Sequence, residues 1–453
     1  MTFKSPPGPA NRSFRFPVAQ MRSLRFILNT LPVLEGYARE YPDCFSLSQK
    51  SSPPVVYFYH PEAIKQLFTS PPEWFNTSSG RILVPILGDN SLLVLDGDRH
   101  RSQRKLLMPP FHGARIQTYA ELITTITQEE TDRWQLNQPF NVRAAMQKIS
   151  LRIIMNVVFG ISSGQRYEEL QVLLTSLVDS IGSPAASTML YFPVLQEDWG
   201  AWSPWGRFWR TKQKINSLLT AEIEQRRIEA DRERDDILSL LLSVRDINGQ
   251  SMSDEELRDE LLTLLFAGHE TTASAISWSL YWVERLPEVK AKLRQELATI
   301  SVVNDPLAVT KLEYLTATVR ETLRIYPIAV NTFPRVAKQP IKIFDYWLEA
   351  GTVLFGSIYL THRRSDLYPE PNCFKPERFL SRQYSSYEYL PFGGGSRLCI
   401  GYALALLEMK LVLANVFSQF ELKRVGNKAL KPVRRGVTLA PPGNMQMIVT
   451  EKI

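Results

Sequence analysis

The chain has 453 residues, a net charge of +7 and a pI near 9.1, and 44% of its residues are hydrophobic. This length can bury a large core, and the composition is that of a globular protein without repeats or low-complexity tracts. Three cysteines lie far apart, which argues against a disulfide framework and favours a reducing compartment. The basic charge favours an acidic partner, but it is too diffuse to indicate nucleic acid.

The first residues contain no apolar core, so the chain does not begin with a signal peptide. No run reaches the ~18 uninterrupted apolar residues that a membrane span requires. We therefore expect a cytoplasmic protein without a membrane anchor.

The first part of the chain mixes helical and extended patterns. Residues 24–41 and 61–67 have helical spacing, and residues 55–59 are typical of a strand. Residues 82–87 form an apolar patch that includes Leu83. On these residues alone, the patch indicates a packed loop.

A basic segment follows at residues 96–105. His100 and Arg104 are four positions apart and share one face of a helix, so both side chains can point at one anion. Arg101 and Lys105 face another way. A basic helix face is most often only solvated, so this spacing alone does not establish a site.

Residues 119–134 and 146–159 have helical patterns, and glycines and prolines then interrupt residues 181–209. The interrupted stretch concentrates aromatic side chains: Tyr191, Phe192, Trp199, Trp202, Trp205, Phe208 and Trp209. Such a density indicates an interface, a membrane contact or the edge of a packed core. Residues 211–234 follow as a charged, solvated helix.

The longest helical pattern runs from residue 254 to residue 286 and ends before Pro287. About thirty residues of helix span roughly 45 Å, enough to cross a whole domain. Its middle reads Ala267-Gly268-His269-Glu270-Thr271-Thr272. Threonine hydroxyls can bond back to carbonyls and open the helix, and such a defect often marks a functional site. We expect His269 to make a polar contact rather than to bind a metal.

Glu321 and Arg324 lie three positions apart on a predicted helix over residues 312–326. Such pairs are usually exposed and weak. The flanking residues are apolar, so we expect this pair to be buried and to need a further partner, for which Arg378 is the candidate. We assign these three residues to folding rather than to catalysis.

The segments after that helix are predicted to be strands. We expect a strand over residues 328–333, followed by Arg335, and a hairpin formed by residues 341–344 and 352–355. Residues 420–453 alternate weakly and also favour strands.

The segment from Pro391 to Gly401 reads Pro-Phe-Gly-Gly-Gly-Ser-Arg-Leu-Cys-Ile-Gly and precedes an apolar helix. Three glycines allow a tight bulge, and Cys399 sits just ahead of the helix, where unpaired amides and the helix dipole favour a thiolate. A thiolate is a soft ligand for iron. Two other interpretations remain on these residues alone: an inert buried cysteine, or a phosphate loop that lacks the usual Lys-Ser/Thr ending.

The order Phe-x-x-Gly-x-Arg-x-Cys-x-Gly resembles the cysteine-ligand loop of the cytochrome P-450 family, the haem-thiolate monooxygenases. Counting this loop, five motifs occur in family order between residues 96 and 405; the others are the basic pair, the Gly-x-Glu-Thr segment, Glu-x-x-Arg and Pro-Glu-Arg-Phe. The resemblance implies haem b with the Cys399 thiolate as axial ligand of the iron. The chain resembles bacterial members of the family that have no membrane anchor, and among these its motifs are similar to those of the fatty-acid-hydroxylating branch.

The fold that this resemblance implies is mainly α with smaller β-sheets, in a single domain over residues 1–453. Haem lies between a long distal helix and the proximal cysteine loop with its helix. We expect a mixed N-terminal lobe of about residues 1–95 and a helical haem-binding lobe of about residues 96–453.

The resemblance also assigns roles to individual residues. Those implied to contact haem are Phe392, Gly401 and the cations that meet its propionates, His100, Arg104, Arg335 and Arg397. Those implied to be catalytic, by delivering protons to dioxygen, are Glu270 and Thr271. Those implied to line the substrate pocket are Leu83, Leu264, Ala267, Ala329, Val330 and Asn331. Glu321, Arg324 and Arg378 match the structural Glu-Arg-Arg lock of the family.

The implied function is insertion of one oxygen atom from dioxygen into a small apolar substrate. The pocket positions are mostly aliphatic, which favours a fatty acid or a terpenoid, and Arg81 at the mouth can hold a carboxylate. The alternatives are a haem-thiolate peroxygenase or isomerase that does not use dioxygen, and a non-catalytic haem carrier or sensor. The intact Glu270-Thr271 pair favours the monooxygenase.

The chain contains no flavin or iron–sulfur segment, so electrons must come from separate proteins. The basic residues Arg99, Arg101 and Lys105 favour an acidic ferredoxin, with its reductase, as the donor. We expect a monomer, and the aromatic residues between positions 191 and 209 can form a peripheral contact with a membrane surface.

Overall fold

The computed structural model describes residues 4–9, 29–49, 52–76, 82–111, 113–160, 163–182, 186, 188–190, 192–229, 234, 236–245 and 249–453. Arg81 and Tyr191, which the sequence places in a pocket mouth and an aromatic stretch, lie outside these residues.

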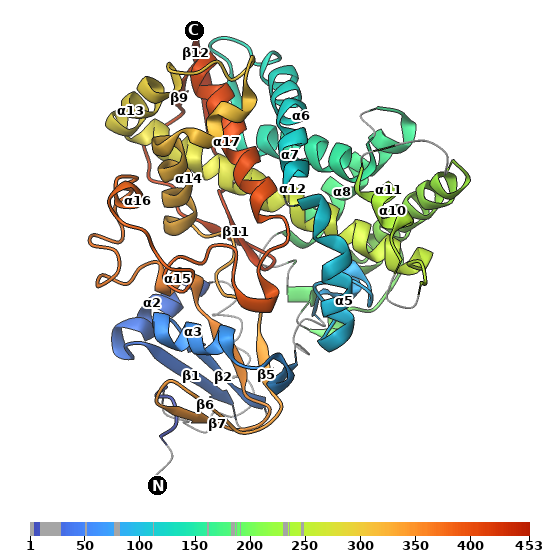
Figure 1. Cartoon of the computed structure of the whole chain (residues 1–453), viewed down its shortest axis with the longest axis vertical. Helices are drawn as coiled ribbons and strands as arrows, with labels where there is room; N and C mark the ends of the chain where they lie inside the picture. The colour runs from blue at the N-terminus through green and yellow to red at the C-terminus, as the bar shows by residue number, and fades with distance from the viewer. Residues whose placement is uncertain are drawn as a thin grey trace.

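Helices form most of the described chain (Figure 1). They are α2 (Thr30–Glu40), α3 (Pro61–Thr69), α4 (Val84–Leu87), α5 (Gly97–Leu107), α6 (Ala114–Thr131), α7 (Val142–Phe159), α8 (Gln165–Gly182), α10 (Pro204–Ile228), α11 (Ile237–Ser243), α12 (Asp254–Arg285), α13 (Pro287–Leu297), α14 (Glu313–Ile325), α15 (Ile358–Thr361), α16 (Arg378–Ser381) and α17 (Tyr402–Gln419). Short 3₁₀ turns lie at Pro72–Trp74, Pro109–Phe111, Thr188–Leu190, Pro193–Leu195, Pro306–Lys311 and Gly395–Arg397.

The strands are short and form small sheets. They are β1 (Cys44–Gln49), β2 (Ser52–Phe58), β3 (Phe75–Asn76), β4 (Pro139–Asn141), β5 (Arg335–Ala337), β6 (Ile341–Ile343), β7 (Tyr346–Leu348), β8 (Val353–Gly356), β9 (Phe420–Arg424), β10 (Val433–Arg435), β11 (Thr438–Ala440) and β12 (Gln446–Lys452). The mainly helical fold class predicted from the sequence is therefore confirmed.

The largest sheet joins the two ends of the sequence. Its strand order is β1-β2-β8-β5-β3, with β8 parallel to β2 and the other pairs antiparallel. In Figure 1 the early strands, in blue, and the late ones, in orange, lie together at the end of the molecule that carries the N-terminus. The sheet near the N-terminus is thus completed by residues 335–356, and the lobe boundary near residue 95 stays a prediction.

The hairpin predicted between residues 341–344 and 352–355 is wrong. β6 pairs instead with β7, in a register that places Ile341 opposite Leu348 and Ile343 opposite Tyr346. The chain reverses at Phe344, whose φ of 56° is left-handed. Residues 341, 343, 346 and 348 are buried while 342 and 347 are exposed, and this alternation fixes the register of β6 and β7. β8 does not belong to this hairpin and pairs with β2 instead.

The strand predicted over residues 328–333 is also absent. Two isolated bridges join Ala329 to Thr438 and Asn331 to Ser357. Pro327 and Pro334 flank the segment, and a proline has no backbone N–H to donate to a ladder. The segment bends at Ile328 and Val330, and it pairs with two different partners rather than with one strand.

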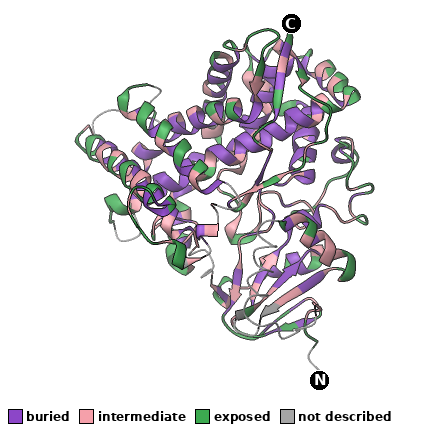
Figure 2. Ribbon diagram, turned by 180° about the vertical axis from the view of Figure 1, so that it is seen from behind, coloured by how far each residue is buried: buried purple, intermediate pink, exposed green. Residues whose placement is uncertain are grey.

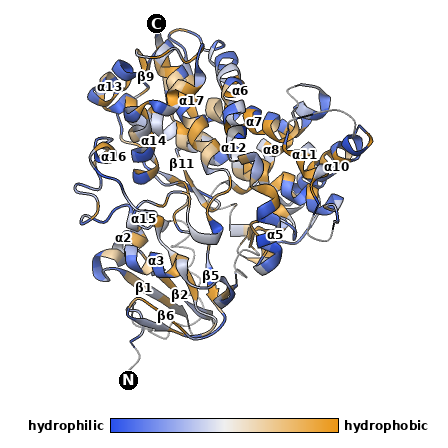
Figure 3. Cartoon of the chain, viewed as in Figure 1, coloured by the Kyte–Doolittle hydropathy of each residue, from blue (hydrophilic) through white to orange (hydrophobic). Residues whose placement is uncertain are grey.

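α12 runs through the centre of the helical part, and most of its residues are buried (Figure 2). A reciprocal capping box begins the helix, because Ser253 Oγ accepts from the Glu256 N–H at 3.2 Å and Glu256 Oε2 accepts from the Ser253 N–H at 2.9 Å. Gly268 lets α7 approach closely, since a Cβ there would lie 2.9 Å from Ile154 Cγ1. α17, which is apolar over most of its length (Figure 3), packs against α12 and α6.

The opening that the sequence predicts in the middle of α12 does not occur. The Thr271 hydroxyl donates to the Ala267 carbonyl at 2.6 Å, and the Thr272 hydroxyl donates to the Gly268 carbonyl at 2.9 Å. These bonds supplement the backbone ladder without replacing it, so the helix continues from residue 254 to residue 285. Within the described ranges, no helix has the length and apolar character needed to cross a membrane.

Candidate functional site

The loop before α17 is built around three glycines. Gly393 and Gly395 have φ values of 72° and 62°, a region that disfavours other residues. Gly394 is required for a different reason, because a Cβ there would lie 2.2 Å from the ring of Phe68 on α3. The loop therefore fits tightly between α3 and α17.

This loop holds Cys399 at the start of α17. The Cys399 N–H donates to the Phe392 carbonyl at 3.0 Å and closes the bulge. A Cβ added to Gly401 would meet no atom closer than Phe111, at 4.0 Å. The helix start beside the cysteine is thus open on that side, as a flat ligand would require.

Cys399 is exposed, yet desolvation by the surrounding protein raises the pKa of its thiol. The residue as a whole therefore keeps exposed surface while its thiol is desolvated. The Gly401 N–H and the charge of Arg104 act in the opposite direction, but they do not outweigh desolvation. Desolvation thus outweighs the favourable effect of the helix start on the thiolate, whereas a bound metal cation would stabilise the thiolate.

Four basic side chains gather near this loop, and we call His100, Arg104, Arg335 and Arg397 the basic cluster. Burial, with Arg397 and Arg104 nearby, lowers the pKa of His100 to about 3. Burial beside Arg397 lowers the pKa of Arg335 to about 10. Burial also lowers the pKa of Arg397 to about 10, although Asp96 opposes the shift. Because the cations repel one another in a desolvated site, bound carboxylates would be stabilised there.

The contacts of Arg397 and Arg335 fix their positions. Arg397 pairs with Asp96 at 2.9 Å, and its guanidinium lies 5.3 Å from the centre of the Phe333 ring. Arg335 donates to the Leu67 carbonyl and lies 5.7 Å from the centre of the Phe68 ring. Both arginines are therefore held in place by contacts with neighbouring protein groups.

The opposite wall of the site is α12. Leu264, Ala267 and Thr271 follow one another at helical spacing and share one face. Leu264 is buried, whereas Ala267 is exposed in the middle of a helix whose other residues are mostly buried. His269 faces elsewhere and is 1% exposed, with Nδ1 2.8 Å from the Leu265 carbonyl oxygen, which is the polar contact expected from the sequence.

Glu270 does not point at Thr271. Arg143 Nη2 donates to Glu270 Oε1 at 2.8 Å, and both side chains are less than 10% exposed. Gln147 also donates to Glu270, and Arg435 Nε lies 3.6 Å from Oε1. The sequence did not reveal these three partners, because they come from α7 and β10 and share no motif with Glu270.

The predicted pocket residues outside α12 differ in how far they are buried. Ala329 and Asn331 are partly buried, and the Asn331 Oδ1 atom is buried with no hydrogen-bond partner among the described residues. Leu83 is buried beside α4. Val330 packs in a cluster with Leu34, Tyr59 and Leu439, and its place at the pocket stays a prediction.

Glu321, Arg324 and Arg378 are brought together as a buried network. Arg324 Nε donates to Glu321 Oε2 at 2.7 Å, and Arg378 Nε donates to Glu321 Oε1 at 3.1 Å. Arg324 also donates to the carbonyls of His362 and Pro371, both at 2.8 Å. These bonds tie α14 to the chain that leads to the cysteine loop.

A sequence model of the cytochrome P450 family matches residues 6–449. The chain belongs to the cytochrome P450 family. It is similar to putative cytochrome P450 135B1 of Mycobacterium tuberculosis, with 35% identity over 96% of this chain and 89% of the relative. Putative cytochrome P450 135A1 of the same species is 34% identical over 97% of this chain and 94% of the relative.

Solved structures of cytochromes P450 share the fold. A cyanobacterial CYP120A1 with bound retinoic acid superposes with a TM-score of 0.86 at 24% identity and covers 100% of both chains. The heme domain of cytochrome P450DA gives a TM-score of 0.84 at 21% identity and covers 100% of this chain and 99% of the other.

Cytochromes P450 are monooxygenases that bind haem through a cysteine thiolate. The residues present fit that cofactor: a cysteine at the start of α17, an open helix start and a desolvated basic cluster suited to two propionates. The cysteine in the ligand position of this chain is Cys399.

The aromatic stretch is half packed and half exposed. Trp205 and Phe208 are buried on α10. Trp199 and Trp202 are 59% and 71% exposed, and their rings stack with centres 6.3 Å apart. A packed core edge and an exposed surface thus both occur within this stretch.

Proposed function

We propose that this cytochrome P450 hydroxylates a fatty acid or a terpenoid with electrons from an acidic ferredoxin. The observation that carries the proposal is the aliphatic face of α12, on which Leu264 and exposed Ala267 lead to Thr271. Each methylene of a ligand buried against such a face gains about 0.8 kcal/mol. A polar metabolite would gain little there.

In this proposal the basic cluster holds the propionates and Cys399 is the axial ligand. When bound, haem supplies the activation of dioxygen and the transfer of one oxygen atom to the substrate. Thr271 and Glu270 then supply protons. Thr271 must turn its hydroxyl away from the Ala267 carbonyl, and Glu270 must leave Arg143, before either group can pass a proton into the site.

Asn331 supports a substrate that carries one polar group. Its buried Oδ1 has no partner among the described residues, and an unpaired buried acceptor costs about 1–3 kcal/mol. A hydroxyl or carboxylic acid group can satisfy the amide, which both donates and accepts. Ala329 beside it leaves the rest of this wall apolar.

The donor and membrane proposals rest on two exposed surfaces. Arg99, Arg101 and Lys105 are exposed on α5, while His100 between them is buried in the site. An acidic ferredoxin would meet these cations close to the basic cluster. The exposed Trp199–Trp202 pair suits a peripheral contact with a lipid surface, where tryptophan is favoured.

Ligand titration tests the substrate class. Palmitic acid, farnesol and a polar metabolite of similar mass should be titrated while the low-to-high-spin shift of the haem spectrum is recorded. The proposal predicts shifts with palmitic acid or farnesol, weakened in Asn331→Ala. A shift with the polar compound alone would overturn it.

A second assay separates monooxygenase from the peroxygenase alternative. Product should form with NADPH, ferredoxin, reductase and dioxygen. Product formed only when hydrogen peroxide is added, and not with the redox proteins, would favour a peroxygenase.

A further inference from the structure

Glu270 lies between two arginines that have different surroundings. Arg143 is buried with Glu270 and reaches it at 2.8 Å. Arg435, on the other side, has Nε 3.6 Å from Glu270 Oε1, too long for a hydrogen bond, and this Nε has no partner among the described residues. Arg435 is therefore near enough to attract the carboxylate without binding it.

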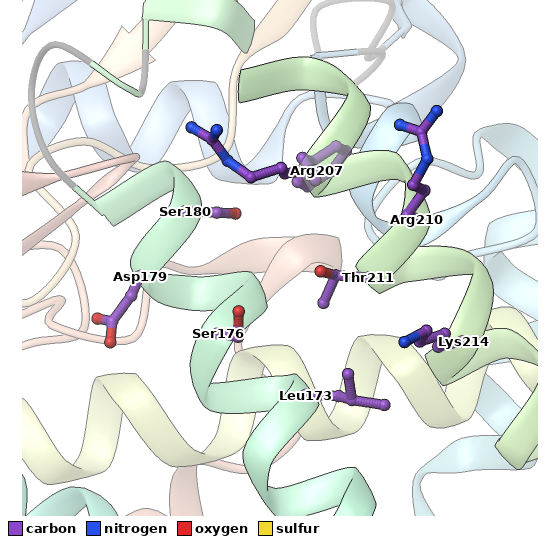
Figure 4. A pocket seen from close by; sticks show the side chains of 9 residues that line it. Leu173, Ser176, Asp179, Ser180, Arg207, Arg210, Thr211 and Lys214 are labelled. Carbon is purple, nitrogen blue, oxygen red and sulfur yellow. The ribbon is translucent and has the colours of Figure 1, made fainter. Parts of the chain in front are cut away.

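Arg435 is held at that distance by a second carboxylate. Its Nη2 donates to Asp179 Oδ1 at 2.7 Å, and the Asp179 side chain is 57% exposed. Asp179 of α8 lines a groove, and Arg207 and Lys214 line the same groove from α10 (Figure 4). One guanidinium thus lies between a buried acid and an exposed one.

The end of α8 is shaped to admit this guanidinium. Gly182 is the last residue of α8, and a Cβ there would lie 2.3 Å from Arg435 Nη2. Any larger residue would displace Arg435 from Asp179. The position of Arg435 therefore depends on the backbone of α8 as well as on charge.

The hairpin that carries Arg435 also contacts the candidate pocket. Arg435 is paired with Thr438 across the β10–β11 hairpin, and Thr438 is bridged to Ala329. The Leu439 N–H donates to the Ile328 carbonyl at 2.8 Å. A ligand that moves the segment of Ala329 would move the hairpin and Arg435 with it.

We infer that Arg435 is a positioning residue for Glu270, and that Asp179 sets how firmly Arg435 attracts the Glu270 carboxylate. The inference rests on the proposed role of Glu270 in proton delivery. With Asp179 in place, Arg435 is shared, and Glu270 can leave its ion pairs, take a proton from water and pass that proton toward Thr271. Arg435 itself does not carry protons, because a guanidinium keeps its charge in proteins.

Removing the charge of Asp179 and removing that of Arg435 should change the restraint on Glu270 in opposite directions. In Asp179→Asn, Arg435 turns wholly to Glu270 and restrains it. In Arg435→Gln, Glu270 keeps only the restraint from Arg143 and Gln147 and is freer. Gly182→Ala should resemble Asp179→Asn, because it displaces Arg435 from Asp179 without changing any charge. The matched control is Asp198→Asn, which removes the acid of another surface pair, Asp198–Arg210 at 3.2 Å.

Three measurements on the holoenzyme test this inference. They are the share of NADPH electrons recovered in product rather than in hydrogen peroxide, the solvent deuterium isotope effect on turnover, and the infrared carboxylate band of Glu270, identified by its loss in Glu270→Gln. We expect Asp179→Asn and Gly182→Ala to lower the product share about two- to fivefold, the scale of a partly exposed ion pair. Asp179→Asn and Gly182→Ala should both increase the isotope effect, and they should shift the Glu270 band in the same direction as each other. Arg435→Gln should shift the band and the isotope effect the other way.

The outcomes separate this inference from the proposed function. If Glu270→Gln leaves the product share unchanged, the role of Glu270 in proton delivery fails. If Glu270→Gln lowers the product share but Asp179→Asn and Arg435→Gln move the band in the same direction, or leave it unmoved, Arg435 is only structural. If Arg435→Gln does not fold, Gly182→Ala decides alone, since an unshifted band there overturns the inference.

Discussion

Arg397 and Asp96 form an ion pair of 2.9 Å that joins the cysteine loop to the segment just before α5. The same guanidinium donates to the carbonyls of Leu92 and Leu95, at 3.1 and 2.6 Å. Because α5 carries His100, one side chain couples the candidate iron ligand to the basic cluster. These contacts therefore fix the relative positions of the cysteine loop and α5.

The Glu321 network should be essential for folding. Glu321→Gln leaves Arg324 and Arg378 buried without their carboxylate, and breaking a buried pair in this way costs about 3–5 kcal/mol. We expect a matching fall in the free energy of unfolding and less haem retained. The control Arg382→Gln, which breaks a more exposed pair with Glu388, should cost at most about 1 kcal/mol. Equal costs in the two variants would refute a special role for the lock.

Thr271→Ala should separate electron consumption from product formation. The variant loses the hydroxyl that lies one turn from exposed Ala267. Proton transfer by a positioned group contributes about 10²–10⁴-fold, so product per NADPH should fall at least about tenfold while peroxide rises. The measurement is the ratio of product to peroxide at equal NADPH consumption. Thr272→Ala, on the adjacent position, is the control, and an unchanged ratio in Thr271→Ala would remove this residue from proton delivery.

The ferredoxin surface predicts a salt-dependent rate. Lys105 is exposed on α5, and Lys105→Glu should slow reduction by an acidic ferredoxin most at low ionic strength, because salt screens charges beyond about 10 Å. The matched control is Lys423→Glu on β9, another exposed lysine. Reduction rates measured from low to high salt should converge for native protein and Lys105→Glu. Curves that stay parallel would contradict this docking surface.

Buried Glu408 on α17 should make stability fall as the pH rises. Burial raises the pKa of Glu408 from 4.5 to about 8, so the folded protein keeps this proton over a pH range in which the unfolded chain has lost it. Because the unfolded state then binds fewer protons, the free energy of unfolding decreases between about pH 4.5 and pH 8. Glu408→Gln should remove this contribution, worth at least about 1 kcal/mol.

The check on Glu408 is the unfolding midpoint at pH 5 and at pH 8. Relative to native protein, Glu408→Gln should be more stable at pH 8 than at pH 5, whereas the exposed control Glu73→Gln should show the same difference at both. A Glu408→Gln effect that does not change with pH would show that the carboxyl is ionised in the fold.

Local spacing in the sequence predicted much of this site. The four-residue interval of His100 and Arg104 placed both in the basic cluster, and the apolar flanks of Glu321 and Arg324 indicated that the pair is buried. In these cases the information lies within one helix or one loop, where geometry follows directly from sequence separation.

The features that sequence spacing did not predict depend on contacts between distant segments. Nothing near Glu270 in the sequence indicates Arg143 or Arg435 as its neighbours, because the packing of α7 and the β10–β11 hairpin against α12 brings them together. The burial of Val330 with Leu34 and Leu439 likewise depends on contacts between segments that are far apart in the sequence.

The most direct test of the whole account is the carbon monoxide spectrum of the reduced protein. Native protein and the control Cys373→Ser, which changes an exposed cysteine outside the site, should both give the strongly red-shifted haem band of a thiolate ligand. Cys399→Ser should lose that band. If Cys399→Ser keeps the band, Cys399 is not the iron ligand and the haem site is not the one described at the start of α17.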